Sequence, residues 1–264
     1  VFSANGNISN IITNPRINLA AKGTLNLANI NKAYPVKLEN ELAGILKADI
    51  TTNFDMNSVE KGNYQNIKNS GEIIVSNFKY EGKDVANPFF IDKTAILFNT
   101  NSIKLNEFEA KTGTSDLSLN GNLDNFYGFL FKDQVLKGNF NLNSNNLKVA
   151  DFLSKETTSS GDKTPSSALK IPAFLDIKLN ATAKTVLYDN INLSNVSGDV
   201  YIKDEAVKLQ NLKTDVFGGN IGFSGNVSTK EKTPKFAMDL DLKQLNIADS
   251  FSNLEMLKSI APIA

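Results

Sequence analysis

The sequence predicts an all-β protein of antiparallel strands, and three observations lead to this class. Apolar and polar residues alternate with a period of two along much of the 264-residue chain, as expected where one face of a strand is buried and the other is in water. Asn, Gly and Asp, which favour turns, separate the alternating runs. A block of this strand pattern also recurs later in the chain, which is typical of a repetitive architecture.

The alternating runs extend from the beginning to the end of the chain. The clearest cover residues 17–27, 46–56, 175–179 and 236–242. Helical spacing occurs in two short segments, near residues 57–67 and 247–260. The later segment carries a single basic residue, Lys258, so we expect it to pack on the sheet rather than to lie on a membrane surface.

The repeat consists of two blocks that follow one another in the same order. Residues 103–123 align without gaps with residues 207–227, and both stretches lead from an apolar-Lys-Leu strand through Leu-x-Leu or Ile-x-Phe to Gly-Asn. Residues 140–151 then match residues 238–249. The ordered succession of both blocks favours true repetition over chance similarity between strands.

A polar segment separates the two copies. It contains Gly161 and Pro165 among Ser, Thr, Lys and Glu residues, a composition that favours a flexible loop. We therefore expect a first β-repeat region over residues 1–153, a flexible polar loop over 154–169, and a second β-repeat region over 170–264 that ends in a short helix.

The composition excludes several classes of function. The chain has no His, Cys or Trp, so it lacks the usual nucleophile–His pairs and the usual zinc ligands. The 28 basic and 28 acidic side chains balance, and no basic surplus is present for nucleic-acid binding. We expect no enzyme activity, no cofactor and no metal.

Two arrangements of carboxylates offer alternatives to this expectation. A glycosidase uses a pair of carboxylates, and five acidic residues could supply one: Asp199, Asp204, Glu205, Asp239 and Asp241. These residues fall on polar strand positions and in turns. Asn53, Asp55 and Asn57 have the spacing that begins a calcium loop, but Ser58 occupies the place of the required turn glycine. A solvated strand face is the simpler interpretation of both.

Several motifs, taken in order along the chain, resemble the AsmA family, in particular its Bacteroidetes version. In the first half these are Ala43-Gly44, Tyr64-Gln65-Asn66-Ile67, Asn77-Phe78, Ser115-Asp116-Leu117 and Leu136-Lys137-Gly138. In the last third they are Leu187-Tyr188-Asp189-Asn190, Leu209-Gln210-Asn211-Leu212, Phe217-Gly218-Gly219, Leu240-Asp241-Leu242 and Leu257-Lys258-Ser259-Ile260. The resemblance covers nearly the whole chain.

This resemblance implies a fold and a function. AsmA-like proteins are anchored in the bacterial inner membrane and extend a repetitive β-structure into the periplasm, similar to the groove of TamB and other bridge-like lipid transfer proteins. It implies an elongated sheet folded into a groove, with one or two short helices. It also implies phospholipid acyl chains as ligand, envelope proteins as partners, and an inner-membrane anchor outside this sequence, which would be an interior piece of a longer chain.

The groove lining is predicted from the alternating apolar positions. We expect it to comprise Ile50, Phe54, Leu117, Leu119, Leu175, Ile177, Leu179, Ile221, Phe223, Phe236, Met238 and Leu240. The same alternation would arise in the closed core of a β-sandwich, and the resemblance favours the groove.

The leading interpretation is a periplasmic lipid-binding module that takes part in phospholipid transport between the inner and outer membranes and in outer-membrane biogenesis. The alternative is a scaffold or interaction module for outer-membrane protein assembly that carries no lipid. A carboxylate hydrolase ranks third.

Overall fold

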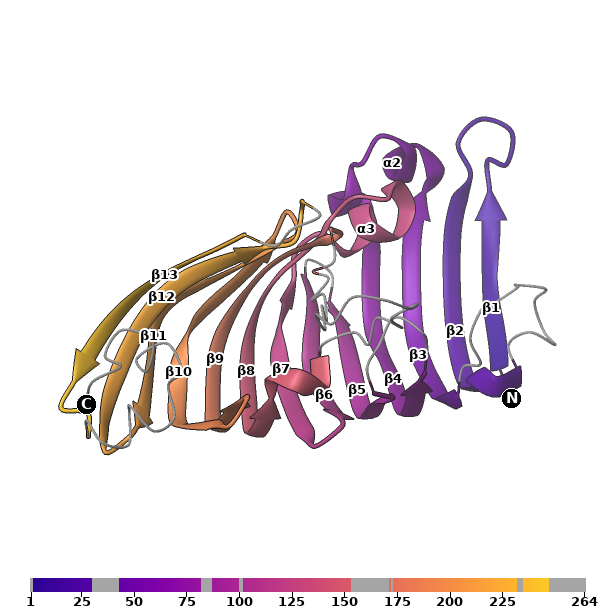
Figure 1. Cartoon of the computed structure of the whole chain (residues 1–264). Helices are drawn as coiled ribbons and strands as arrows, with labels where there is room; N and C mark the ends of the chain where they lie inside the picture. The colour runs from indigo at the N-terminus through magenta and orange to yellow at the C-terminus, as the bar shows by residue number, and fades with distance from the viewer. Residues whose placement is uncertain are drawn as a thin grey trace, which may run out of the picture.

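The protein folds into one long β-sheet whose strands follow one another in chain order (Figure 1). The computed structural model describes residues 2–29, 43–81, 87–99, 102–152, 171, 173–231 and 235–246. Its strands are β1 (Phe2–Ser9), β2 (Arg16–Asn26), β3 (Ala43–Asp55), β4 (Lys68–Tyr80), β5 (Phe89–Asn99), β6 (Ser102–Thr112), β7 (Ser115–Leu123), β8 (Leu136–Lys148), β9 (Leu175–Tyr188), β10 (Ile191–Lys203), β11 (Ala206–Val216), β12 (Gly219–Ser228) and β13 (Lys235–Lys243). The predicted all-β class is confirmed.

Short helices lie at the ends of the strands. The α-helices α2 (Met56–Glu60) and α3 (Phe126–Lys132) follow β3 and β7, which run in the same direction, and the 3-10 helix η2 (Tyr64–Asn66) comes shortly after α2. We call this end of the strands the upper rim. The 3-10 helices η1 (Leu27–Asn29) and η3 (Val149–Phe152) follow β2 and β8, which run the other way. They mark the lower rim.

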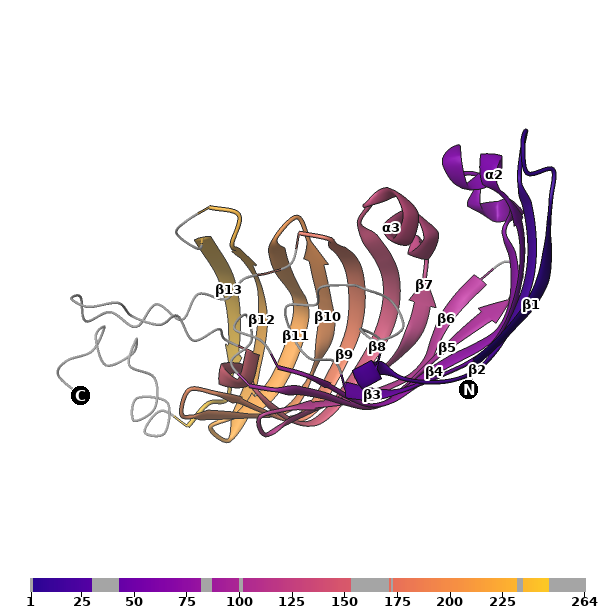
Figure 2. The ribbon, with the colours of Figure 1, turned by 90° about the vertical axis from the view of Figure 1, so that its right-hand side faces the viewer.

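The sheet is an open trough. In Figure 2 the strands bend, and α2 and α3 lie on the concave side near the upper rim. The register of neighbouring strands carries one set of side chains to the concave face and the alternate set to the convex face. In β9, for example, the concave Leu179 and Ala183 are buried, whereas the convex Asn180, Thr182 and Lys184 are exposed.

The pairing is antiparallel throughout the sheet except between β8 and β9. These two strands pair in parallel, from Leu136 opposite Leu175 to Lys148 opposite Leu187. The predicted antiparallel order is thus interrupted by one parallel junction. Most of the connection between the two strands, including residues 153–170 and with them the predicted polar loop, lies outside the described residues.

The sequence repeat is also present in the strand pairing. Between β6 and β7 the register shifts after the pair Leu105–Gly121 and resumes at Phe108–Leu119. Between β11 and β12 it shifts after Leu209–Gly225 and resumes at Leu212–Phe223, which are the aligned positions of the second copy. Such bulges bend and twist a sheet locally, so both copies bend at the same point.

The first predicted helix is present but interrupted. Asp55 caps α2, because its carboxylate accepts hydrogen bonds from the backbone N of Ser58 at 3.0 Å and from the Ser58 hydroxyl at 2.7 Å. The chain then turns at Gly62, where φ is +72°, before it forms η2. The second predicted helix, residues 247–260, lies outside the described residues.

Candidate apolar groove

Strand register places the predicted lining residues on a single face of the sheet. Ile50 pairs with Gly71, which is opposite Phe98 in β5; the ring of Phe98 contacts α3 on the concave side. The same register carries the concave face through the remaining strands to β13. The predicted residues on this face are Ile50, Phe54, Leu117, Leu119, Leu175, Ile177, Leu179, Ile221, Phe223, Met238 and Leu240. The backbone of Phe236 is in register with them, opposite Val227, and its side chain lies outside the described residues.

The apolar side chains of the concave face form rows that run across the strands. One row passes from Ile177 in β9 through Ile202 and Val207 to Val227 in β12. A neighbouring row begins at Phe140 in β8 and continues through Leu179, Val200 and Leu209. Because neighbouring strands are about 4.8 Å apart, each row offers an apolar contact at regular intervals along the trough.

Exposure of the concave face increases from the middle of the sheet to its edges. Leu179 in β9 is 7% exposed, whereas Met238 in β13 is 54% exposed and Leu240 43%. Ile8 in β1, at the other edge, is 60% exposed. Ile171 is also buried, and it donates its backbone N–H to the hydroxyl of Thr229, which follows β12, at 3.2 Å.

An aromatic group closes over the concave face at the upper rim. We call Tyr64, Phe98, Phe126 and Tyr127 the rim cluster. The ring centroids are 6.2 Å apart for Tyr64 and Tyr127, 5.5 Å for Phe126 and Tyr127, and 6.1 Å for Phe98 and Phe126, within the range of favourable aromatic pairs. The cluster thus joins η2 and α3 to the concave face of β5.

Tyr127 is fixed by burial and by one polar contact. Burial raises the pKa of its phenol to about 12, although the hydrogen bond from the Asn69 side-chain amide acts in the opposite direction. The phenol is therefore neutral at physiological pH. Reasoning from the sequence did not assign this cluster a role. The dense run of aromatic residues in 126–131 was its only signal, and the other two members, Tyr64 and Phe98, come from η2 and β5.

A cavity of about 230 Å³ lies beside the rim cluster. Its lining is mixed: six of the residues are aromatic or aliphatic and five are polar, namely Tyr64, Phe126, Tyr127, Ile67, Ile103 and Leu123, and Gln65, Asn99, Ser102, Asp124 and Asn125. Ile67 and Ile103 are buried. The hydroxyl of Tyr64 is also buried and has no hydrogen-bond partner within the described part of the chain.

A buried carboxylate secures the lower rim. Asp151 in η3 is 7% exposed and accepts hydrogen bonds from the backbone N of Thr114 at 2.8 Å and from the Ser115 hydroxyl at 2.8 Å. Burial raises the pKa of this carboxyl, but the hydrogen bonds outweigh it and hold the pKa below its usual value. Gly113 makes room for the carboxylate, because a Cβ there would lie 2.4 Å from its Oδ1.

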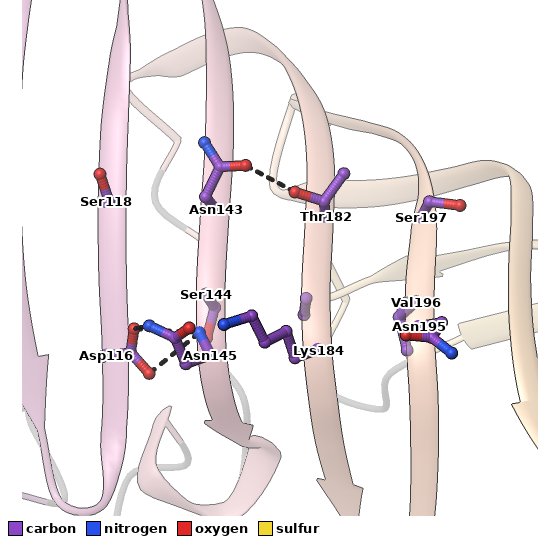
Figure 3. Close-up of a pocket in the computed structure, with 11 residues that line it drawn as sticks. Asp116, Ser118, Asn143, Ser144, Asn145, Thr182, Lys184, Asn195, Val196 and Ser197 are labelled. Atoms are coloured by element: carbon purple, nitrogen blue, oxygen red, sulfur yellow. Dashed lines mark hydrogen bonds between the residues drawn. The ribbon is translucent and has the colours of Figure 1, made fainter.

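The convex face carries polar side chains, in contrast to the apolar concave face. Figure 3 shows two rows across β7, β8, β9 and β10 that line a hollow of about 360 Å³. The rows are Ser118, Asn143, Thr182 and Ser197, and Asp116, Asn145, Lys184 and Asn195. Thr182 donates to Asn143 at 2.6 Å, and Asn145 donates its backbone N to Asp116. The sheet is thus amphipathic across its thickness.

The acidic residues of the hydrolase alternative are spread over this convex side and its turns. Asp199 lies in β10 and Asp239 in β13, three strands apart or about 14 Å, which exceeds the separations used by glycosidases. Asp241 forms an ion pair with Lys243 at 2.9 Å. Asp204 and Glu205 occupy the β10–β11 turn, both with positive φ.

The described residues show neither a metal cluster nor a membrane-spanning helix. No group of three or more acidic side chains among them could hold a metal ion, and Asp55 of the calcium alternative is engaged as the cap of α2. No helix in the described ranges is long and apolar enough to cross a membrane. Comparisons with protein-family models, with curated proteins and with solved structures find no match for this chain.

Proposed function

We propose that the concave face binds the acyl chains of phospholipids and that the chain is an AsmA-like module of phospholipid transport across the periplasm. The observation that carries this proposal is the continuity of the apolar rows over four neighbouring strands each, from Phe140 in β8 to Leu209 in β11 and from Ile177 in β9 to Val227 in β12. Burial of a methylene group contributes about 0.8 kcal/mol. An acyl chain that moves from one strand to the next exchanges one apolar contact for a similar one, so it can slide without a large barrier.

The open mouth of the trough supports the same function. Charged headgroups are costly to bury without partners, and a trough leaves its mouth open to water along its length. The headgroup can therefore remain solvated while the acyl chain lies on the concave face. Attachment to the inner membrane and contacts with envelope proteins belong to this proposal as well.

The proposal is tested at β13, where the concave side chains are already exposed. Met238→Asp combined with Leu240→Asp places charge on the apolar face where little packing can be lost. We expect the full-length protein purified from membranes to carry co-purified phospholipid, detected by native mass spectrometry, and the double variant to carry much less. Ala237→Asp is the matched control, because Ala237 is an exposed neighbour on the convex face.

The scaffold alternative gives the opposite result. If the wild-type protein carries no phospholipid, or if the double variant and the Ala237→Asp control carry equal amounts, the concave face is not a lipid path. The chain would then act as an interaction module in the envelope.

A further inference from the structure

The turn between β1 and β2 presents two exposed isoleucines at the upper rim. It comprises residues 10–15, and it rises beyond α2 in both views of the molecule (Figure 1, Figure 2). Ile11 is 70% exposed and Ile12 is 98% exposed. Turns are built mainly from Gly, Pro, Asn, Asp and Ser, so the geometry of the turn does not explain two adjacent β-branched residues. Their exposure indicates a contact site.

Hydrogen bonds to the start of α2 hold this turn in place. The side-chain amide of Asn14 donates to Oδ1 of Asp55 at 3.0 Å, and its own Oδ1 accepts from the backbone N of Asn57 at 3.0 Å. The backbone N of Met56 donates to the carbonyl of Pro15 at 2.9 Å. The isoleucines are thus presented by a fixed turn, which need not be ordered first when a partner binds.

The size and the polarity of this tip fit a phospholipid bilayer. A stable protein–protein interface buries about 800 Å² on each partner, far more than two side chains at the end of a hairpin offer. A bilayer accepts a small apolar wedge, because the gain grows with each methylene that leaves water. Residues 9–15 contain no charged side chain, so no charge enters the hydrocarbon with the isoleucines.

The charges of the hairpin favour the same partner. Residues 2–26 contain two basic residues, Arg16 and Lys22, and no acidic residue. Lys22 is paired with Asp49 at 2.5 Å, whereas Arg16 is exposed at the base of the turn, where its guanidinium suits the phosphate of a lipid. Asp55 also lies at the base, but its carboxylate already accepts two hydrogen bonds from Ser58.

We propose that Ile11 and Ile12 insert into the boundary between the headgroups and the acyl chains of a phospholipid bilayer. This docking does not rest on the proposed function, because it uses neither the concave face nor a lipid bound there. Arg16 lies at the level of the lipid phosphates, and the polar neighbours Asn10 and Thr13 remain in the hydrated headgroup layer. The β1 end of the trough then faces a membrane.

The first test uses tryptophan as a probe of insertion, since the chain contains none. Ile12→Trp places the probe at the tip, and Tyr188→Trp places it at a 58% exposed position near the lower rim as the matched control. The vesicles consist of phosphatidylcholine brominated on its acyl chains, with phosphatidylglycerol as the minor component. The emission of Ile12→Trp should shift to shorter wavelength and be quenched, and that of Tyr188→Trp should do neither.

The second test removes the apolar side chains. Ile11→Ser combined with Ile12→Ser should weaken binding of the 264-residue chain to unbrominated vesicles of the same lipids at least about tenfold in a flotation assay. Tenfold corresponds to about 1.4 kcal/mol, less than full burial of one isoleucine contributes. Because both residues are exposed, the variant should keep the wild-type stability. Tyr188→Ser is the control and should bind as the wild type does.

Three results would overturn the docking at the tip. The first is a wild-type protein that does not bind these vesicles, and the second is a serine variant that binds them as tightly as the wild type. The third is self-association in analytical ultracentrifugation that is lost in the serine variant, while vesicles leave the emission of Ile12→Trp unchanged. In that case the tip packs on a second copy of the chain.

The docking and the proposed function fail separately. The Met238→Asp, Leu240→Asp variant should bind vesicles as the wild type does, because β13 lies at the opposite edge of the sheet from β1. Loss of vesicle binding in this variant alone would assign the binding to the concave face and overturn the docking at the tip. If the tip inserts but no phospholipid co-purifies with the protein, the docking stands and the proposed lipid path is wrong.

Discussion

At the scale of single residues, two polar side chains fix the short helices at the two rims of the sheet. Asp55 is the last residue of β3, and Asp151 lies in η3 just after β8. Each accepts hydrogen bonds that fix a short helix, α2 at the upper rim and η3 at the lower rim. The sequence shows where these two residues stand in the chain, but it does not show which groups donate hydrogen bonds to them. The spacing of Asp55 also fits the start of a calcium loop, but in the structure Asp55 caps a helix.

Asp151 gives a prediction about stability and its dependence on pH. Asp151→Asn should lower the free energy of unfolding at pH 7 by about 1–3 kcal/mol, because the Thr114 backbone N–H and the buried Ser115 hydroxyl lose a charged acceptor. The folded-state pKa of Asp151 is lowered, so its contribution is complete above the unfolded value near 4 and is lost as the pH falls through the folded value.

This prediction is checked by urea denaturation at several pH values between 7 and 3. The difference between wild type and Asp151→Asn should be constant above about pH 5 and should shrink below pH 4. Asp189→Asn, at an exposed position in the β9–β10 turn, is the control and should leave stability nearly unchanged. A difference that does not depend on pH would mean that the ionised carboxylate is not what holds η3.

At the scale of elements, the parallel pair β8–β9 is explained by the repeat. The bulged hairpin β6–β7 recurs as β11–β12, so equivalent strands are five apart in the sheet. With an odd number of strands per repeat, purely antiparallel pairing would reverse the second copy. One parallel junction keeps both copies in the same direction, and equivalent turns then lie at the same rim.

The cap of α2 can be tested at the same scale. Asp55→Ala removes the acceptor for the Ser58 backbone N and hydroxyl, and it should lower the urea midpoint of unfolding, because N-terminal helix donors then lack a partner. Asp55→Ser should retain most of the wild-type midpoint, since Ser is also a good cap. Equal midpoints for Asp55→Ala and wild type would show that α2 is held by packing alone.

At the scale of the whole molecule, the open sheet determines the shape in solution. Thirteen strands at about 4.8 Å spacing give a sheet about 58 Å across. For comparison, a compact chain of this length would have a radius of gyration near 18 Å. We expect small-angle scattering of the protein to give a value above 18 Å with an elongated distance distribution. A value at or below 18 Å would mean that the two ends of the sheet fold together into a sandwich.

Much of the fold and of the candidate groove could be predicted from the sequence. Alternation identified the face to which Leu179 and Phe223 belong, because a period of two is a local property of a strand. The rim cavity could not be predicted, because Tyr64, Ile103 and Leu123 come from three separated segments. Alternation also could not separate an open trough from a closed sandwich, since both bury the same face.

The sequence by itself thus determined the class, the repeat and the two faces of the sheet, all of which follow from local periodicity and turn chemistry. The tertiary structure alone decided the parallel junction, the bend at the two equivalent bulges, and the meeting of α3 and η2 over Phe98. The physical reason is that these features depend on which strands pair and where their register shifts. Those choices are settled by contacts between residues far apart in the chain.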